Sequence, residues 1–138
     1  MALKITLKPY EKLILGGAVI TNGATKGEFV VENPVAILRQ NSIMTPDEAN
    51  SPARRIYLAI QLMYVDPQRL RTHQQLYWQM VKEFLEAAPS SLSLVDEINE
   101  FIYNEKYYDA LKSAKNLIEF EEEVIERATK CSEIIPVG

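Results

Sequence analysis

Two adjacent arginines, Arg54 and Arg55, are the residues of this sequence best suited to bind an anion. A guanidinium can donate two parallel hydrogen bonds to one phosphate or carboxylate group. Neighbouring residues of a helix point about 100° apart, so at least one of the two must reach the surface. Lys12, Lys26 and Arg39 supply further positive charge near the N-terminus. These five cations form the candidate binding set, and a phosphate-bearing polyanion is the ligand class that they would suit.

A structural role for the arginines is the alternative. Either one could form an ion pair with Asp47, with Glu48 or with a glutamate of the predicted strands. An exposed pair of this kind contributes about 0–1 kcal/mol to stability and needs no ligand. Residue chemistry alone leaves both interpretations open.

The other reactive residue types do not form a catalytic pattern. The single histidine, His73, lies between Thr72 and Gln74 and is expected at the surface. A zinc site would need further His or Cys ligands at suitable spacing, and no serine carries a nucleophile motif. Gly16-Gly17 is a glycine pair without the rest of a phosphate-loop or dinucleotide fingerprint. We therefore expect no enzymatic activity, no cofactor and no metal.

Two other clusters are interpreted as structural. The run Glu-Phe-Glu-Glu-Glu at residues 119–123 lacks the alternating ligand spacing of a calcium loop and lies within a predicted helix, so a solvated helical face is expected. Tyr57, Tyr64, Tyr77 and Trp78 could stack on bases. Their helical spacing favours the hydrophobic core instead.

The arginines follow two consecutive helix-start signals. Thr45 can cap a helix, Pro46 suits its first position, and Glu48 completes a capping box. Ser51 and Pro52 repeat the cap-then-proline pattern, so a first turn should end there and a longer helix should begin. Before this junction the sequence indicates strands, and after it the sequence indicates helices.

The pattern predicts an α+β fold. Leu3, Ile5 and Leu7 alternate with polar residues as in a strand with one solvated face, and Gly16-Gly17 is typical of a tight turn. We expect a small antiparallel β unit (a sheet or a barrel) in residues 1–44, with four or five strands in residues 2–40 and no helix in residues 10–38. A C-terminal bundle of four helices should follow within residues 45–138, in one continuous structural unit with the β half.

A β unit of about forty residues is too small to bury much apolar surface by itself. It should dock on the helices, on a second copy of the chain, or on both, because exposed strand edges invite pairing. We therefore expect a homo-oligomer that forms through the β half.

The net charge of the chain is −4, and the charged residues are distributed unevenly along the sequence. Residues 1–45 carry a net charge of +2, residues 46–88 are balanced, and residues 89–138 carry −6. A polyanion would therefore meet the β half or the junction rather than the acidic C-terminal part. The single Cys131 gives no disulfide framework, and no apolar run approaches the roughly 20 residues of a membrane span. We expect a cytoplasmic protein without a membrane partner.

The sequence resembles the FlbT family of flagellar regulators over nearly its whole length. The matching strings are Leu7-Lys8-Pro9 with Glu11-Lys12-Leu13-Ile14, Gly17-Ala18-Val19-Ile20 with Asn22-Gly23, Ile43 to Ala49, Ser51 to Leu62, and Tyr107 to Lys112 with Leu117-Ile118. The junction is the most specific part. Two positions depart from the family pattern: Tyr10 replaces a glycine after Pro9, and the loop after Gly23 carries only Lys26 where the family often has arginines.

The resemblance implies a post-transcriptional repressor of flagellin synthesis. Such a protein associates with the 5′ untranslated region of flagellin mRNA and reduces its translation or stability. The alternative is a protein-interaction adaptor or chaperone in flagellar assembly, whose helical part binds flagellin or another flagellar regulatory protein. The first function needs a positive surface that is continuous in space, and the second needs an exposed apolar groove between the helices.

Overall fold

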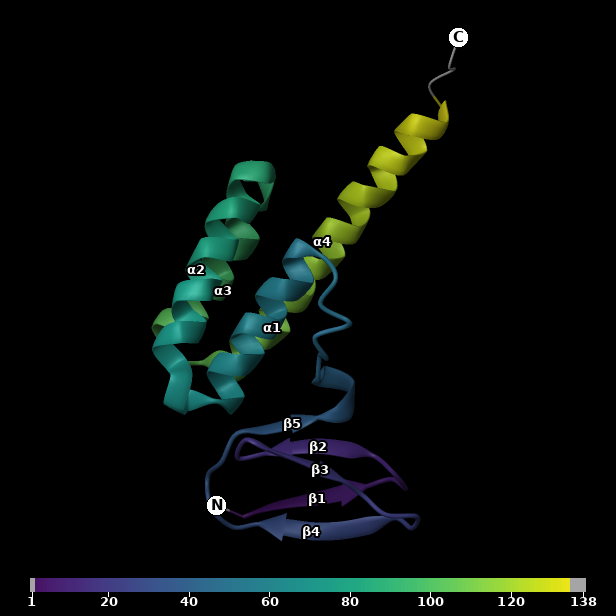
Figure 1. Cartoon of the computed structure of the whole chain (residues 1–138), viewed down its shortest axis with the longest axis vertical. Coiled ribbons are helices and arrows are strands. Elements are labelled where there is room, and N and C mark those ends of the chain that lie inside the picture. Colours follow the sequence, from purple (N-terminus) through teal and green to yellow (C-terminus); the bar gives the residue numbers. More distant parts are fainter. Residues whose placement is uncertain (1, 135–138) are drawn as a thin grey trace.

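The computed structural model describes residues 2–134, with side chains described through residue 130. Five short strands form the N-terminal half, and four α-helices form a bundle beside it (Figure 1). The α+β fold is therefore confirmed, and no helix occurs in residues 10–38.

The strands form two small sheets rather than one. In the first sheet, β1 (Leu3–Leu7) pairs with β4 (Gly27–Val31); in the second, β2 (Lys12–Leu15) lies between β3 (Ala18–Thr21) and β5 (Ile37–Arg39). Every pairing is antiparallel. Gly16 and Gly17, with φ of +58° and +89°, make the two-residue turn between β2 and β3.

The middle strand of the second sheet, β2, has buried residues on both of its faces. Successive residues of a strand point to opposite faces, so Leu13 and Ile14 of β2 enter different cores. Leu13 packs with Ile5 and Leu7 between the two sheets. Ile14, with Leu38 opposite it on β5, belongs to the core that the helices build. This sheet therefore contributes to the helical core on one side and to a separate core between the two sheets on the other.

The four helices are α1 (Pro52–Val65), α2 (Leu70–Ala87), α3 (Leu92–Tyr103) and α4 (Tyr107–Ile134). Three short 3₁₀ turns join elements: η1 (Gln40–Ser42), η2 (Pro67–Arg69) and η3 (Pro89–Ser91). Helix α1 packs against α2 and α4, and α3 packs against α4. The C-terminal half of α4 projects beyond the bundle (Figure 1).

Small residues allow the helices to approach closely. Ala53 and Ala59 on α1, with Ala110 and Ala114 on α4, are all at most 1% exposed. Larger side chains fill the rest of the interior. The largest that are fully buried in the helices are Ile56, Ile60, Met63, Tyr77, Val95, Ile98, Leu111 and Leu117.

Two expectations for α2 were wrong, and helical periodicity explains both. His73 is buried, because it precedes Tyr77 by four residues and so lies on the same inward stripe. Its Nε2 lies 3.0 Å from Asp66 Oδ2, which ties α2 to the connection after α1. Trp78 is 46% exposed, since it lies about 100° around the helix from the buried Tyr77.

The core assignment is confirmed for Tyr57 and Tyr77, and Tyr64 is partly buried. The hydroxyl of Tyr77 donates to Asn99 Oδ1 at 2.5 Å, and burial raises the pKa of Tyr77. Burial likewise raises the pKa of Tyr57 to about 12. These rings are therefore structural in this chain.

Candidate functional site

The connector between β5 and α1 is held in place by polar side chains of α1. Tyr57 donates to the carbonyl of Ser42 at 2.6 Å. Gln61 forms two bonds with the backbone of Met44: its Nε2 donates to the carbonyl at 3.0 Å, and its Oε1 accepts from the N–H at 2.8 Å. The segment that separates the two halves therefore has a defined position against α1.

The first helix-start signal forms its capping box but not a helix. The Thr45 N–H donates to Glu48 Oε1 at 3.0 Å, and the Glu48 N–H donates to Thr45 Oγ1 at 3.3 Å. Hydrogen bonds from Thr45 lower the pKa of the Glu48 carboxyl. The helix itself begins at Pro52, where Ser51 Oγ accepts from the Arg54 N–H at 3.3 Å.

The anion at the start of α1 comes from the chain itself. Glu121 of α4 is only 9% exposed, and its Oε2 accepts from the Ala53 N–H at 2.9 Å. A carboxylate at this place satisfies a free backbone donor and favours the positive end of the helix dipole. The expectation that residues 119–123 form a solvated face is therefore wrong at Glu121.

Arg54 is bound to the same acidic segment. Its Nη2 lies 3.0 Å from Glu122 Oε1, and its Nη1 donates to Asn50 Oδ1 at 3.4 Å. An ion pair was one of the two interpretations from the sequence, but the partner is not Asp47, Glu48 or a strand glutamate. The Arg54 side chain is 34% exposed, so part of it remains accessible to solvent.

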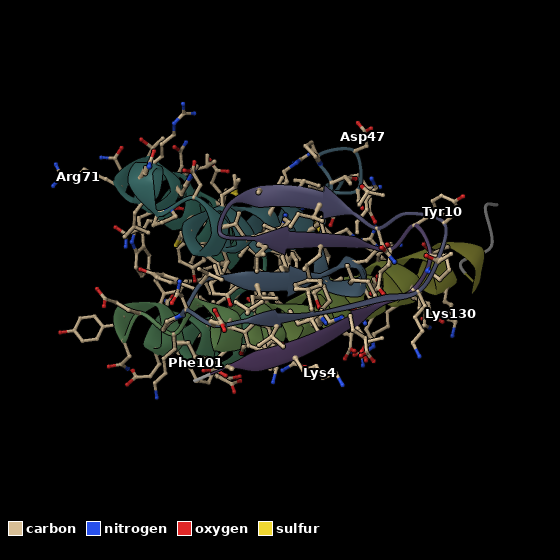
Figure 2. All side chains as sticks on the ribbon, turned by 90° about the horizontal axis from the view of Figure 1, so that it is seen from below. Lys4, Tyr10, Asp47, Arg71, Phe101 and Lys130 are labelled. Atoms are coloured by element: carbon tan, nitrogen blue, oxygen red, sulfur yellow. The ribbon has the colours of Figure 1, made fainter. Side chains whose placement is uncertain are left out.

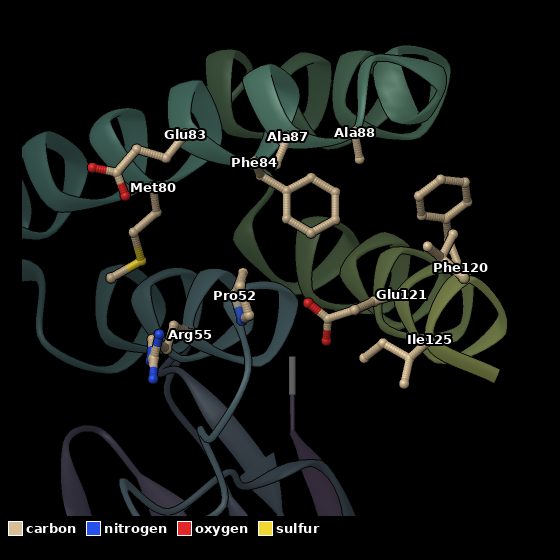
Figure 3. Close-up of a pocket in the computed structure, with 11 residues that line it drawn as sticks. Pro52, Arg55, Met80, Glu83, Phe84, Ala87, Ala88, Phe120, Glu121 and Ile125 are labelled. Carbon is tan, nitrogen blue, oxygen red and sulfur yellow. The ribbon is translucent and has the colours of Figure 1, made fainter. Parts of the chain in front are cut away.

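The neighbouring Arg55 contributes to a groove between helices, which we call the helical groove. This groove encloses about 390 Å³ between the start of α1, the end of α2 and the middle of α4 (Figure 3). Met80, Phe84, Phe120, Val124 and Ile125 supply most of its apolar lining. An exposed apolar groove between helices is therefore present.

A second, more open groove lies between the β half and the junction, and we call it the polar groove. It has a volume of about 880 Å³. Lys12 and Arg39 line it together, along with Lys8 and Tyr10 from the turn between β1 and β2. Residues of the junction, Thr45 and Glu48 among them, form its other side.

Several charged groups of the polar groove already have partners. Arg39 Nη2 donates to the Thr6 carbonyl at 2.7 Å and lies 3.2 Å from Glu11 Oε2. Glu11 also accepts from the Lys8 N–H at 2.9 Å; this bond and Arg39 lower the pKa of the Glu11 carboxyl. Lys12 Nζ donates to Thr21 Oγ1 at 3.1 Å. With three cations and two acids in its lining, the groove has a small positive excess.

The five candidate cations occupy three places. Lys12 and Arg39 lie together in the polar groove, whereas Arg54 and Arg55 lie at the start of α1. Lys26 is exposed in the loop between β3 and β4. Asn22 holds this loop to the turn before Tyr10, because its Nδ2 donates to the carbonyls of Lys8 and Thr25 at 2.9 and 3.0 Å.

Tyr10 was missed as a candidate by sequence reasoning. It is 67% exposed, lines the polar groove and has a φ of +61°. Left-handed backbone favours glycine, so this conformation is uncommon for a tyrosine. The sequence signal that could have identified it is the short connection from Pro9, which follows β1, to Lys12, which begins β2, because so few residues require a tight turn.

The described residues contain neither a metal-binding cluster nor a helix that could span a membrane. No group of three or more His, Cys, Asp or Glu side chains could hold a metal ion there. No helix in that part of the chain is long and apolar enough to cross a membrane.

Comparison with known proteins identifies relatives for almost the whole chain. The family described as "Flagellar protein FlbT" matches residues 3–125. A protein of Bradyrhizobium diazoefficiens named "Probable flagellum biosynthesis repressor protein FlbT 1" is 42% identical over 90% of this chain and 85% of its own length. The "Flagellum biosynthesis repressor protein FlbT" of Caulobacter vibrioides is 36% identical over 89% of each chain. No solved structure matches.

Proposed function

The chain belongs to the FlbT family of flagellar proteins, and from this premise we propose that it represses flagellin synthesis by binding the leader of flagellin mRNA. Relatives at 36–42% identity carry the name of flagellum biosynthesis repressors. Repression by occupying a leader, or by exposing it to a nuclease, is a binding event and needs no catalytic group.

The polar groove is the observation that supports RNA as the ligand. Single-stranded RNA is recognised by cations that contact its phosphates together with polar and aromatic groups that contact unstacked bases. The groove brings Lys8, Lys12 and Arg39 together with the amide side chains of Gln40 and Asn41. In this proposal Lys26, Arg54 and Arg55 contact phosphates on either side of the groove.

Leader-RNA binding should be salt-dependent and should weaken when these cations are removed. We expect Lys12→Gln and Arg54→Ala each to weaken binding by roughly fivefold, the effect of losing one hydrogen bond of about 1 kcal/mol. Each should also reduce the slope of log K against log salt by about 0.7, since one phosphate contact on a single strand is lost. Fluorescence anisotropy titrations at salt concentrations from about 50 to 300 mM, over which screening increases, measure both the affinity and the salt slope.

Glu122→Ala is the matched control for the Arg54 variant. It removes the partner of Arg54 but leaves the guanidinium, so binding should stay the same or become slightly tighter. If Arg54→Ala and Glu122→Ala lower the melting temperature equally and leave RNA affinity unchanged, Arg54 is part of the scaffold only. If the wild-type chain binds no leader RNA at low salt, the proposed function is wrong.

A second candidate function is supported by the helical groove. Its apolar lining and its two exposed residues on α4, Val124 and Ile125, fit the apolar face of an amphipathic helix. In this case the chain acts as an adaptor or chaperone that binds flagellin or another flagellar regulatory protein. Arg55, Glu83 and Glu121 supply the charged part of the groove lining.

The variant Ile125→Asp tests the adaptor function. Ile125 is 56% exposed, so the protein should remain folded while a charge in the groove weakens binding of purified flagellin at least tenfold. Leu92→Asp is the matched control, because Leu92 is 52% exposed and does not line the groove. Isothermal titration calorimetry measures the affinities. Equal affinities for both variants and the wild type would argue against the adaptor function.

Self-association through the β half remains part of the proposal. Its support is a set of exposed apolar side chains on the strands: Leu3, Val19 and Val30 are 52%, 68% and 54% exposed. In addition, β1, β3, β4 and β5 each pair with a strand on one side only, although Tyr64 of α1 accepts from the Ile37 N–H of β5. The chain's own helices cover Ile14 and Leu38, so a second copy would contact the exposed residues of β3, the outer side of β1 and β4, or a strand edge.

A further inference from the structure

We propose that Tyr10 is a stacking platform for an unpaired RNA base in the polar groove. The inference rests on the proposed function, because it adds a residue that stacks on a base to an RNA site whose cations contact phosphates. The ligand is a single-stranded segment whose base lies on the phenol ring while its phosphate meets a lysine of the same groove.

The exposure and the conformation of Tyr10 are unusual for a tyrosine. The side chain is 67% exposed, and its φ of +61° lies in the left-handed region that costs most residues free energy. Among the described residues, Glu105 is the other non-glycine residue with positive φ. Glu105 follows α3, and its N–H donates to the Ile102 carbonyl, as is usual where a helix ends. Tyr10 has no helix to terminate.

The turn that carries Tyr10 is fixed by hydrogen bonds. The Tyr10 N–H donates to the Gly23 carbonyl at 2.9 Å, and the Glu11 N–H donates to the Lys8 carbonyl at 3.1 Å. Asn22 ties the same turn through the carbonyls of Leu7 and Lys8. Figure 2 shows Tyr10 at the loop end of the strands. The ring is thus presented by a rigid support, which limits the entropy lost when a ligand binds.

The charges around Tyr10 suit a nucleotide better than an apolar partner. Lys8, Lys12 and Arg39 line the same groove, but the carboxylates of Glu11 and Glu48 offset two of the three positive charges. Phosphate contacts alone are therefore few. A base stacked on an aromatic ring typically strengthens binding roughly 5- to 150-fold, as judged by alanine substitution. Among the described residues that line the groove, Tyr10 is the only aromatic one.

Tyr10→Gly and Tyr10→Phe together test the inference. Tyr10→Phe keeps the ring, so the affinity for a single-stranded flagellin leader fragment should stay within about twofold of the wild type. Tyr10→Gly removes the ring and should weaken binding at least about tenfold. The same variant should raise the melting temperature by about 3 °C, because glycine adopts a positive φ without steric cost.

A chemical control removes the base instead of the ring. Removal of the base at one position of the leader fragment should weaken binding to the wild type at least about tenfold. Tyr10→Gly should bind this abasic fragment and the intact fragment with the same, weak affinity. Tyr103→Gly is the protein control, because Tyr103 is 86% exposed at the end of α3 and does not line the groove.

The outcomes separate this inference from the proposed function. If the wild type and Tyr10→Gly bind the leader equally, the stacking role is wrong and the RNA function stands. If Tyr10→Gly loses stability as well as binding, Tyr10 is a structural residue and the inference is wrong. If the wild type binds no RNA at low salt, the stacking role of Tyr10 and the proposed RNA function are both wrong.

Discussion

Glu121→Ala is expected to lower the free energy of unfolding by about 2 kcal/mol, although the residue lies in an acidic segment. The change removes the acceptor of the Ala53 N–H, and Ala53 is fully buried. It also removes a negative charge from the start of α1, where the helix dipole favours one. Urea denaturation followed by circular dichroism measures the loss.

Glu122→Ala is the matched control, one residue further along α4. Glu122 is 56% exposed and pairs with Arg54 at the surface, so its loss should cost about 0–1 kcal/mol. Glu121→Gln keeps an oxygen acceptor without the charge and should fall between the two alanine variants. Equal losses for Glu121→Ala and Glu122→Ala would contradict the capping role of Glu121.

Leu38→Ala should destabilise the whole chain by about 3 kcal/mol, which is typical for truncating a buried leucine. Leu38 lies on β5, is 1% exposed and belongs to the core that the helices build. The substitution leaves a cavity where the sheet contacts the helices. The loss of stability should therefore appear in the unfolding of both the β half and the helical part. Thermal unfolding measures it, with the helices followed by circular dichroism at 222 nm and the β half followed by the NMR signals of its strand amides.

Leu3→Ala controls for the loss of a leucine from the β half. Leu3 is 52% exposed, so its truncation should cost less than about 1 kcal/mol. If residues 1–44 and the helical part are one structural unit, the two signals should shift together in Leu38→Ala. A helical transition that does not move while the β signal does would show two independent units.

The junction connects the two candidate sites of the molecule. Thr45 and Glu48 line the polar groove, and Pro52 and Arg55 line the helical groove. The RNA and adaptor functions therefore share Arg55 but otherwise use different surfaces, and the variants above change one groove at a time. Tyr10→Gly and Lys12→Gln affect the polar groove, whereas Ile125→Asp affects the helical groove.

Local patterns in the sequence were sufficient for the elements of the fold. The alternation of Leu3, Ile5 and Leu7 predicted the strand β1, Gly16-Gly17 predicted the tight turn between β2 and β3, and Ser51-Pro52 predicted the start of a helix. Each of these signals depends on steric and hydrogen-bonding preferences within a few residues. The division of the strands into two sheets was not predictable in this way, because it depends on which strands pair.

The partners of the charged residues were decided only by the tertiary structure. The sequence identified Arg54 as an anion-binding or ion-pairing residue, but its partner Glu122 and the capping Glu121 lie 68 residues beyond Arg54 and Ala53, respectively. The burial of His73 could have been inferred from its helical spacing to Tyr77, whereas its bond to Asp66 could not. The meeting of Lys12 with Arg39 likewise depends on β2 pairing with β5. Residue type determines which bonds a side chain can form, but packing of distant segments decides which of them it does form.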